Sequence, residues 1–172
     1  EKYGEWGIIL GATEGVGKAF CERLAKEGMN VVMVGRREEK LKELGEELKN
    51  TYEIDYKVVK ADFSLPDATD KIFAATENLD MGFMAYVACL HSFGKIQDTP
   101  WEKHEAMINV NVVTFMKCFY HYMKIFAAQD RGAVINVSSM TGISSSPWNG
   151  QYGAGKAFIL KMTEAVACET EK

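Results

Sequence analysis

The feature that most constrains the fold is a glycine-rich turn between an apolar run and a helical pattern near the N-terminus. The run 8–10, Ile-Ile-Leu, leads into 11–17, Gly-Ala-Thr-Glu-Gly-Val-Gly, and a helical pattern starts at Lys18. Glycines let a backbone turn tightly and approach a ligand, and a helix start offers free N–H groups and the positive end of its dipole. The segment predicts a strand, a turn and a helix that hold a pyrophosphate, with a purely structural turn as the alternative.

Two other phosphate-binding motifs can be compared with this turn. A Walker A loop needs glycine, four residues, Gly-Lys and then serine or threonine, but Ala12 and Ala19 occupy the first and last of these positions. ATP binding is therefore disfavoured. The common dinucleotide motif is Gly-x-Gly-x-x-Gly, whereas Gly11, Gly15 and Gly17 give Gly-x-x-x-Gly-x-Gly. The glycines are expected to serve the same chemistry in a different spacing.

Strand patterns alternate with helical patterns along the whole chain. Strands are predicted at 7–10, 30–35, 56–60, 82–88 and 133–138, and helices at 15–27, 38–50, 67–77, 101–128 and 151–169. Such alternation predicts parallel strands joined by right-handed crossovers. We therefore predict an α/β fold with a doubly wound, Rossmann-like parallel sheet of order 3-2-1-4-5, as a single domain over residues 1–172. Its ligand crevice is expected at the carboxyl ends of the strands.

Composition narrows the classes of protein. A hydrophobic content of 47% supplies a core, and a formal charge of −4 argues against a nucleic-acid partner. No apolar run reaches the ~18 residues of a transmembrane segment, and no signal peptide is apparent. The cysteines lack Cys-x-x-Cys spacing and the histidines lack metal-ligand spacing, so we expect reduced thiols, histidines at the surface or in loops, and no metal site. A cytoplasmic location is predicted.

A tyrosine and a lysine four residues apart follow the last predicted strand. If 151–169 is helical, Tyr152 and Lys156 share a face, and the ammonium group lies beneath the phenol. A nearby cation favours phenolate, so we expect Lys156 to lower the pKa of Tyr152 from about 10 towards the range useful for acid–base catalysis. Ser139, after the last strand, is placed to polarise a carbonyl oxygen. A half-buried aromatic beside a solvated charge is the alternative interpretation.

Together these residues resemble the classical short-chain dehydrogenase/reductase family over nearly the whole chain. The matching positions are Gly11, Gly15, Gly17, Asp62, Asn111, Ser139, Tyr152 and Lys156. The stretches 3–6 and 28–41 are most similar to the branch that contains 17β-hydroxysteroid dehydrogenases and very-long-chain 3-oxoacyl-CoA reductases. The resemblance implies a catalytic set of Asn111, Ser139, Tyr152 and Lys156, in which Asn111 holds a water that links the lysine to solvent.

The resemblance also implies a nicotinamide dinucleotide cofactor. The residues expected to bind it are Gly11, Thr13, Glu14, Gly15, Val16, Gly17, Arg36, Arg37, Asp62, Phe63, Ala88, Tyr152 and Lys156. After the second strand, Arg36 and Arg37 supply two cations and no carboxylate, which suits the 2′-phosphate of NADP(H) rather than the ribose hydroxyls of NAD. Alternatively, the arginines begin a solvated helix and pair with Glu38 and Glu39.

Two asparagines fall inside the predicted helix 101–128. Asparagine is slightly unfavourable inside a helix, so their presence indicates a specific role. Asn111 takes the family's catalytic position, and Asn109 is expected to be exposed or locally bonded. The apolar residues of this helix are most simply core residues: Phe115, Met116, Phe119, Tyr122 and Met123. In relatives this helix and the one that carries Tyr152 form an interface, so a homodimer or homotetramer is expected.

The edges of the predicted crevice hold further candidates. The family resemblance suggests that Asp62 contacts the adenine ring. A helix-cap role for Asp62 or Ser64 is equally consistent with the sequence. His91 follows the fourth strand, where the crevice opens, and is placed to contact nicotinamide or substrate. The stretch 144–150, Ser-Ser-Ser-Pro-Trp-Asn-Gly, fits either a pocket wall or a plain turn.

Several positions depart from the family pattern. Leu10 replaces a frequent threonine, and Gly155 replaces a common serine. The stretch 86–89, Tyr-Val-Ala-Cys, replaces the usual Asn-Asn-Ala-Gly, and Cys89 is expected to narrow or reshape the site beside the nicotinamide ribose. The chain is also expected to be truncated at its C-terminus, because family members continue with another strand and a substrate-covering loop.

The predicted function is that of an NADP(H)-dependent oxidoreductase that transfers hydride between nicotinamide and a ketone or secondary alcohol. A bulky apolar substrate, such as a steroid or a fatty-acyl compound, is implied by the resemblance to the branch. The alternative is a non-catalytic dinucleotide-binding or oligomer-forming protein of the same fold, because fold does not guarantee activity.

Overall fold

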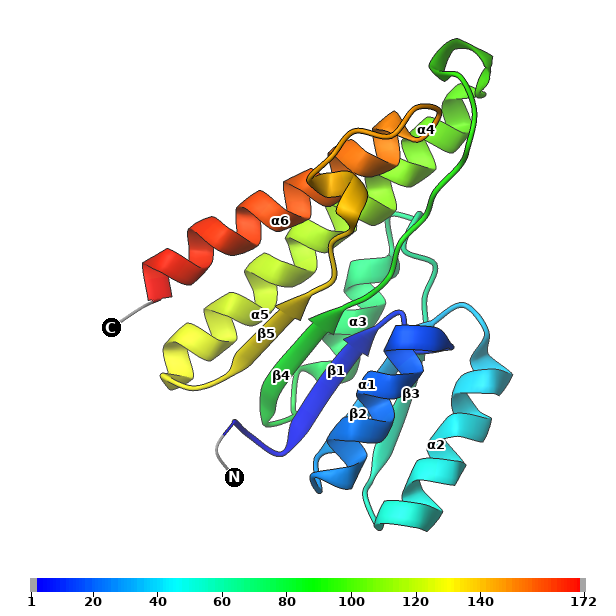
Figure 1. Ribbon diagram of the computed structural model, residues 1–172. Coiled ribbons are helices and arrows are strands. Elements are labelled where there is room, and N and C mark those ends of the chain that lie inside the picture. Colours follow the sequence, from blue (N-terminus) through cyan, green and yellow to red (C-terminus); the bar gives the residue numbers. More distant parts are fainter. Residues whose placement is uncertain (1–2, 171–172) are drawn as a thin grey trace.

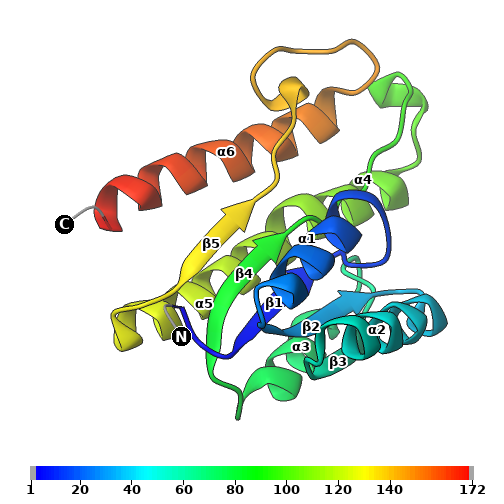
Figure 2. The same ribbon diagram turned by 60° about the horizontal axis from the view of Figure 1, so that its bottom comes forward.

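Five parallel strands form the centre of the computed structural model, which describes residues 3–170 (Figure 1, Figure 2). They are β1 (Trp6–Leu10), β2 (Asn30–Gly35), β3 (Tyr56–Lys60), β4 (Met81–Tyr86) and β5 (Ala133–Asn136). Their order is β3-β2-β1-β4-β5, and every neighbouring pair is parallel. This confirms the predicted doubly wound sheet. The ends of the predicted domain, residues 1–2 and 171–172, lie outside the described residues.

Helices cover both faces of the sheet. They are α1 (Gly15–Lys26), α2 (Glu38–Tyr52), α3 (Ala68–Thr76), α4 (Trp101–Ile108), α5 (Phe115–Gln129) and α6 (Gly150–Thr170). The apolar sides of α1 and α2 pack against Ile9 and Met33 on one face, whereas α3, α5 and α6 pack against Ile8 and Leu10 on the other (Figure 1). Successive side chains of a strand point to opposite faces, which divides the core into two clusters.

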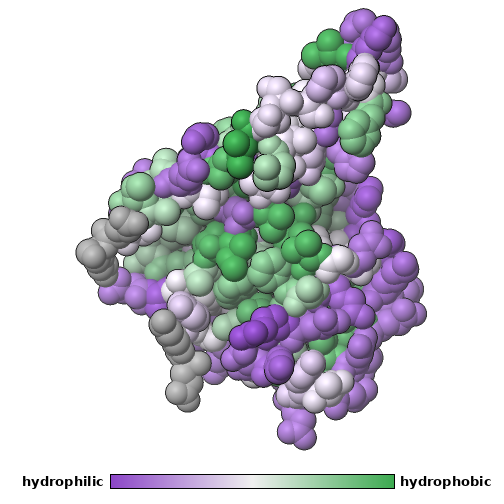
Figure 3. All heavy atoms as spheres, in the orientation of Figure 1, coloured by the Kyte–Doolittle hydropathy of each residue, from purple (hydrophilic) through white to green (hydrophobic). Residues whose placement is uncertain are grey.

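The strands are apolar because helices cover most of the sheet on both sides. β2 and β4 are buried almost along their whole lengths, whereas β5 at the edge is only half-buried. Beside α1, over β4 and β5, Figure 3 shows apolar side chains at the molecular surface. On β5, Ile135 is 42% exposed. Within residues 3–170, β5 is therefore an open, apolar edge of the sheet.

Two strands end earlier than the sequence predicts. β4 ends at Tyr86 rather than at residue 88, and β5 ends at Asn136 rather than at residue 138. The N–H groups of Val87 and Ala88 both donate to the Leu10 carbonyl, at 2.8 and 2.7 Å, so the chain leaves the regular ladder there. The other bounds agree with prediction to within one or two residues.

The predicted helix 101–128 is confirmed in extent, since residues 101–129 are helical throughout, but its middle segment, Asn109–Thr114, is π-helical and separates α4 from α5. Backbone hydrogen bonds in a π-helix span five residues instead of four, so this turn is wider. The sequence pattern also misses two short 3₁₀ turns, Ile96–Asp98 after β4 and Met140–Gly142 after β5. The π-helical segment and both 3₁₀ turns lie in the parts of the chain that follow the carboxyl ends of β4 and β5.

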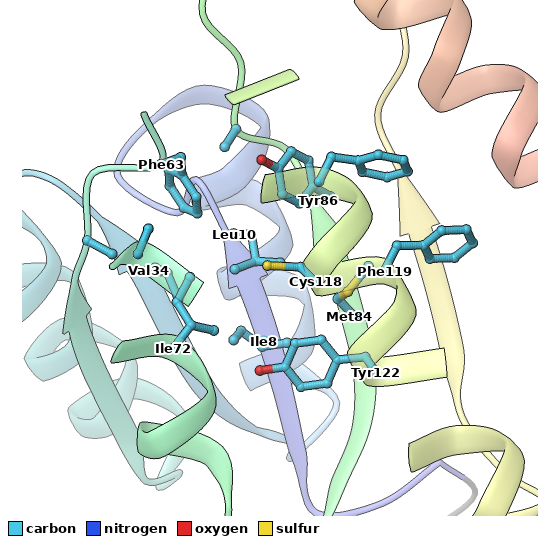
Figure 4. Packing of buried hydrophobic residues seen from close by; sticks show 14 of the residues in the cluster. Ile8, Leu10, Val34, Phe63, Ile72, Met84, Tyr86, Cys118, Phe119 and Tyr122 are labelled. Carbon is cyan, nitrogen blue, oxygen red and sulfur yellow. The ribbon is translucent and has the colours of Figure 1, made fainter. Parts of the chain in front are cut away.

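Figure 4 shows the larger buried cluster, which joins β1, β2 and β4 to α3 and α5. Phe115, Phe119 and Tyr122 are buried here, and Met116 and Met123 are partly buried against it, so the predicted core face is confirmed. Within residues 3–170, no helix is long and apolar enough to cross a membrane.

Candidate active site

The glycine turn requires its glycines for three different reasons. Gly11 has a φ of +101°, and a Cβ on it would lie 2.6 Å from the Ala88 nitrogen. Gly15 has a φ of +56° and faces open space. A Cβ on Gly17 would lie 2.0 Å from the Gly11 carbonyl oxygen. The turn therefore brings the start of α1 against its own entry strand and against the chain after β4, at the edge of the sheet where a ligand would approach.

A cavity of about 380 Å³ opens at this edge of the sheet. Its lining contains most of the residues predicted for the cofactor: Gly11, Thr13, Glu14, Val16, Arg36, Arg37, Asp62, Phe63, Ala88, Tyr152 and Lys156. Gly15 and Gly17 shape the turn beside it without lining it. The structure thus brings segments from five parts of the chain to one cavity, because parallel strands all deliver their following loops to the same edge.

The two arginines differ in their surroundings. Arg37 Nη2 pairs with Glu14 Oε1 at 2.9 Å, across the mouth of the glycine turn. The predicted pairing of the arginines with Glu38 and Glu39 is wrong, since both glutamates pair with Lys42, at 2.9 and 3.3 Å. Among the described residues Arg36 has no ion-pair partner within 4.0 Å, and its exposed guanidinium lines the cavity. Arg36 is therefore the freer of the two cations for an anionic ligand.

Asp62 stabilises a local turn beside this cation. Its Oδ1 atom accepts hydrogen bonds from the Ser64 N–H at 3.0 Å and from the Ser64 hydroxyl at 2.7 Å. Burial opposes ionisation of Asp62, but these hydrogen bonds, with the charge of Arg36, leave its pKa below the ordinary value. The helix-cap interpretation is wrong, because α3 begins at Ala68 with Asp67 at its N-cap. Asp62 instead stabilises a turn before that helix, and this turn places Asp62 and Phe63 in the cavity wall.

Lys156 is 1% exposed and lies one helical turn after Tyr152 on α6. Its ammonium group donates to the Val137 carbonyl at 2.7 Å and lies 5.8 Å from the centroid of the Tyr152 ring. Burial lowers the pKa of Lys156, with the neighbouring Cys89 acting in the opposite direction. The predicted position of the ammonium group beneath the phenol is confirmed, but its hydrogen-bond partner is the backbone just after β5 and not the phenol oxygen.

The pKa of Tyr152 is raised, so the prediction that Lys156 lowers it is wrong for this arrangement. Burial is the largest cause and disfavours the phenolate, and Cys89 acts in the same direction. A hydrogen bond with Ser139 favours the phenolate but does not outweigh these effects. Tyr152 is therefore a protonated phenol at neutral pH.

We expect the midpoint of the phenolate titration assigned to Tyr152, from the difference between the unmutated protein and Tyr152→Phe, to lie above pH 10.0, the ordinary tyrosine pKa, in the absence of cofactor. The reason is that burial stabilises the neutral form relative to a solvated tyrosine. An ultraviolet pH titration measures this difference. A Tyr152 titration below that pH would contradict the structure and restore the expected effect of Lys156.

Ser139 lies beside Tyr152, as the sequence predicts. It is the first residue of a turn after β5, where its hydroxyl oxygen accepts hydrogen bonds from the Thr141 N–H at 3.2 Å and the Thr141 hydroxyl at 3.0 Å. Because Thr141 occupies its acceptor positions, the Ser139 hydroxyl keeps its own proton for donation. Ser139 thus lies within hydrogen-bonding range of Tyr152, which lines the cavity.

Asn111 is 1% exposed and lies in the π-helical segment. Its Oδ1 atom accepts from the Leu90 N–H at 3.1 Å, and its Nδ2 atom donates to the Leu90 carbonyl at 2.7 Å. A Cβ on Gly155 would lie 2.9 Å from the Asn111 Cβ, so the helices touch next to Lys156. Asn109, expected to be exposed or locally bonded, instead donates to the distant Ser64 carbonyl at 3.2 Å.

Two site residues carry little sequence signal. Cys89 is exposed, lines the cavity with Tyr152 and Lys156, and influences the pKa of both groups. The His91 ring lies 5.8 Å from the Tyr152 ring, edge to face, which agrees with its expected place at the crevice. The sequence signal for Cys89 is its departure from the family's usual glycine, and the signal for His91 is its position just after the fourth strand.

The other two histidines lie on helices rather than in loops, and both are partly exposed. His104 on α4 is half-buried, and its ring contacts the Gln151 side chain and, at 3.1 Å, the Ile96 carbonyl. His121 on α5 stacks on Phe73 with 3.8 Å between ring centroids. Within residues 3–170, no group of His, Cys, Asp and Glu side chains could hold a metal ion.

A second cavity, of about 970 Å³, adjoins the first turn of α6. Its wall includes Ile96, Trp101, Met107, Pro147 and Trp148, and both tryptophans are 65% exposed. The stretch 144–150 therefore forms a pocket wall rather than a plain turn. A large apolar ring system fits such a lining.

Comparison with known proteins gives consistent similarities. A family model described as short chain dehydrogenase matches residues 5–172. The chain is 83% identical over 171 residues to the 7beta-hydroxysteroid dehydrogenase of Collinsella aerofaciens, covering 99% of this chain and 65% of that protein. It is 31% identical over 163 residues to the very-long-chain 3-oxoacyl-CoA reductase of Rattus norvegicus, covering 92% of this chain and 52% of that one.

A solved structure described as "Structural and biochemical insights into 7beta-hydroxysteroid dehydrogenase stereoselectivity" matches with a TM-score of 0.98 and 83% identity. The match covers 99% of this chain and 66% of that one. The chain thus spans 65% and 52% of the lengths of the two curated relatives named above.

Proposed function

Because the chain belongs to the short-chain dehydrogenase family, we propose that it is an NADP(H)-dependent oxidoreductase that transfers hydride between nicotinamide and a ketone or secondary alcohol. The observation that carries this proposal is the convergence of Tyr152, Ser139 and Lys156 beside the cavity that the glycine turn and the two arginines line. The residues proposed to contact the cofactor and those proposed for acid–base chemistry thus lie around one cavity.

The residues present fit a dinucleotide phosphate. A Cβ on Gly11 or Gly17 would lie within 2.6 Å of backbone atoms, so the turn packs tightly against the chain after β4 and against the start of α1. The start of α1 offers N–H groups to a pyrophosphate, and Arg36 and Arg37 offer cations to a 2′-phosphate. Lys156 and Ala88 belong to the same lining, and they are proposed to lie beside the nicotinamide ribose.

When bound, the reduced nicotinamide supplies a hydride to the carbonyl carbon. Tyr152 gives its phenolic proton to the carbonyl oxygen, which becomes the alcohol oxygen, and Ser139 donates a hydrogen bond to that oxygen as its charge develops. The raised pKa of Tyr152 keeps this proton in place at neutral pH. Lys156 and Asn111 lie behind the tyrosine and support the return of a proton from solvent.

The substrate is proposed to be a bulky apolar compound of the steroid type. The second cavity supports this, because exposed aromatic and aliphatic side chains bind fused rings by burial of apolar area. The similarity of 83% to a 7beta-hydroxysteroid dehydrogenase supports a hydroxysteroid over a fatty-acyl compound. A cytoplasmic location and a homodimer or homotetramer remain predictions.

A turnover assay tests the proposal on the complete protein. We expect NADPH oxidation with hydroxysteroid ketones at rates well above those with fatty-acyl ketones. Tight NADPH binding without reduction of any ketone in a broad panel would instead favour the non-catalytic alternative.

We expect NADPH to bind more tightly than NADH, and Arg36→Ala with Arg37→Ala to remove roughly tenfold or more of this preference. Charge-assisted hydrogen bonds contribute about 1.5 to 3 kcal/mol, and the 2′-phosphate is the only group that differs between the cofactors. Titration of both cofactors measures the ratio. The matched control is Lys42→Ala, which removes a cation of the following helix, α2, that pairs only with Glu38 and Glu39 among the described residues. Equal affinities in the unmutated protein would refute the preference.

A further inference from the structure

The π-helical segment has no cause in its own sequence. Helices are usually interrupted by proline, by glycine, or by a side chain that inserts between turns. Asn109–Thr114 reads Asn-Val-Asn-Val-Val-Thr and contains neither proline nor glycine. The wider turn must therefore be stabilised by groups from other elements, and π-helical turns of this kind are rare and frequently lie at functional sites.

Tyr86, the last residue of β4, reaches this segment. Its hydroxyl donates a hydrogen bond of 2.6 Å to the Val110 carbonyl, and its side chain is fully buried. Phe115 and Phe63 hold its ring edge to face, with centroids 5.3 and 6.1 Å away. Figure 4 shows Tyr86 inside the buried cluster, between the sheet and the helix. Burial raises the pKa of Tyr86 well above its ordinary value, so its hydroxyl remains a donor.

Asn111 is the residue after the carbonyl that Tyr86 holds. Its amide makes both of its hydrogen bonds to the backbone of Leu90, and its Cβ touches the α6 turn at Gly155. The position of Asn111 is thus set on three sides, by the chain after β4, by α6 and by the π-helical turn. A helical carbonyl bonded by an outside hydroxyl competes less well for the next N–H of its own helix, which favours the wider turn.

We infer that Tyr86 is a positioning residue, whose hydroxyl holds the Val110 carbonyl and the π-helical turn so that Asn111 lies against Leu90 and the turn that carries Lys156. The inference rests on the proposed function, because Asn111 matters for turnover only if the proton returns through Lys156. The inference also explains a role for Tyr86, which stands where family members usually have an asparagine.

The bland alternative is that Tyr86 only fills the core, and the molecule contains a matched control for it. Tyr122 is also fully buried in the same cluster, and its hydroxyl is also bonded, at 3.0 Å from the Thr76 hydroxyl. The two hydroxyls lie at opposite ends of the cluster (Figure 4). Tyr86→Phe and Tyr122→Phe therefore remove the same atom from the same core, but only the first touches the π-helical turn.

For ketone reduction by the complete protein, we expect Tyr86→Phe to lower kcat roughly ten- to hundredfold, as small displacements of a catalytic array do. NADPH affinity should change by less than about twofold, since the variant keeps the ring that packs against Phe63 of the cavity wall. Tyr122→Phe should lose stability but keep kcat per folded molecule within about twofold. Equal kcat values for the two folded variants would overturn the inference.

Two further measurements separate the positioning role from general damage. In an Asn111→Ala background, Tyr86→Phe should cause little further loss of kcat, because the Tyr86 hydroxyl acts by positioning Asn111. A fully additive loss of kcat in the double variant would overturn the inference. Amide hydrogen exchange within 109–115 should accelerate roughly tenfold more in Tyr86→Phe than in Tyr122→Phe. Exchange needs no substrate, so it decides the role of Tyr86 even if no ketone is reduced, which would refute only the proposed function.

Discussion

Tyr152→Phe is expected to lower the rate of ketone reduction by roughly 10² to 10⁴ while NADPH binding persists. The variant keeps the ring that lies 5.8 Å from the His91 ring and deletes only the hydroxyl. Reduction requires a proton for the carbonyl oxygen when hydride reaches the carbon, and Tyr152 is the protonated group beside Ser139. The measurement is the single-turnover rate of the folded variant, with NADPH affinity determined in parallel.

Tyr120→Phe is the control for loss of a tyrosine hydroxyl, since Tyr120 is exposed on α5 and does not line the cavity. It should reduce ketones at the unmutated rate. Near-normal turnover by Tyr152→Phe would reject Tyr152 as the proton donor. A tyrosine that only packs would instead lose stability and retain its rate per folded molecule.

Gly17→Ala is expected to destabilise the protein by about 3 kcal/mol or more and to abolish dinucleotide binding. The new Cβ would lie 2.0 Å from the Gly11 carbonyl oxygen and 3.0 Å from the Ala12 Cα. These neighbours are backbone atoms of the turn, which have no alternative rotamer, so the helix must move away from its strand. Denaturant unfolding and NADPH titration measure the two effects.

Gly150→Ala is the matched control for this substitution. A Cβ at Gly150, in the first turn of α6, meets no atom within 4 Å, and its backbone is not in the left-handed region. Alanine is a better helix former than glycine, so this variant should be as stable as the unmutated protein or slightly more stable. If Gly17→Ala matched Gly150→Ala in stability, the close approach of α1 to the turn would be refuted.

The strand order and most element bounds could be predicted from the sequence because they depend on local patterns. Apolar runs of strand length alternate with helical patterns, and few topologies join such elements by right-handed crossovers. The glycine turn was predictable for the same reason, since Gly11, Gly15 and Gly17 lie close together in the chain. The meeting of that turn with Tyr152 and Lys156 then follows from the topology, which places both at the carboxyl edge of the sheet.

The electrostatics of the site were less predictable. Sequence spacing places Lys156 beneath Tyr152. It does not predict that the ammonium group donates to the Val137 carbonyl or that burial raises the pKa of the phenol. Likewise, Arg37 pairs with Glu14 from the glycine turn and not with its sequence neighbour Glu38. In both cases the decisive partner lies on another element, and solvent exposure depends on all the elements together.

The sequence by itself determined the order of the strands, the backbone turn at the glycines and the helical spacing of Tyr152 and Lys156, because each depends on residues close in the chain. Only the tertiary structure decided where the helix before Phe115 widens into a π-helical turn and which way the pKa of Tyr152 moves. The Tyr86 hydroxyl reaches the Val110 carbonyl across 24 residues of sequence, and Asn111 reaches Leu90 across 21. Hydrogen bonds of this kind and the burial of a phenol form only when distant segments pack together, so no local pattern specifies them.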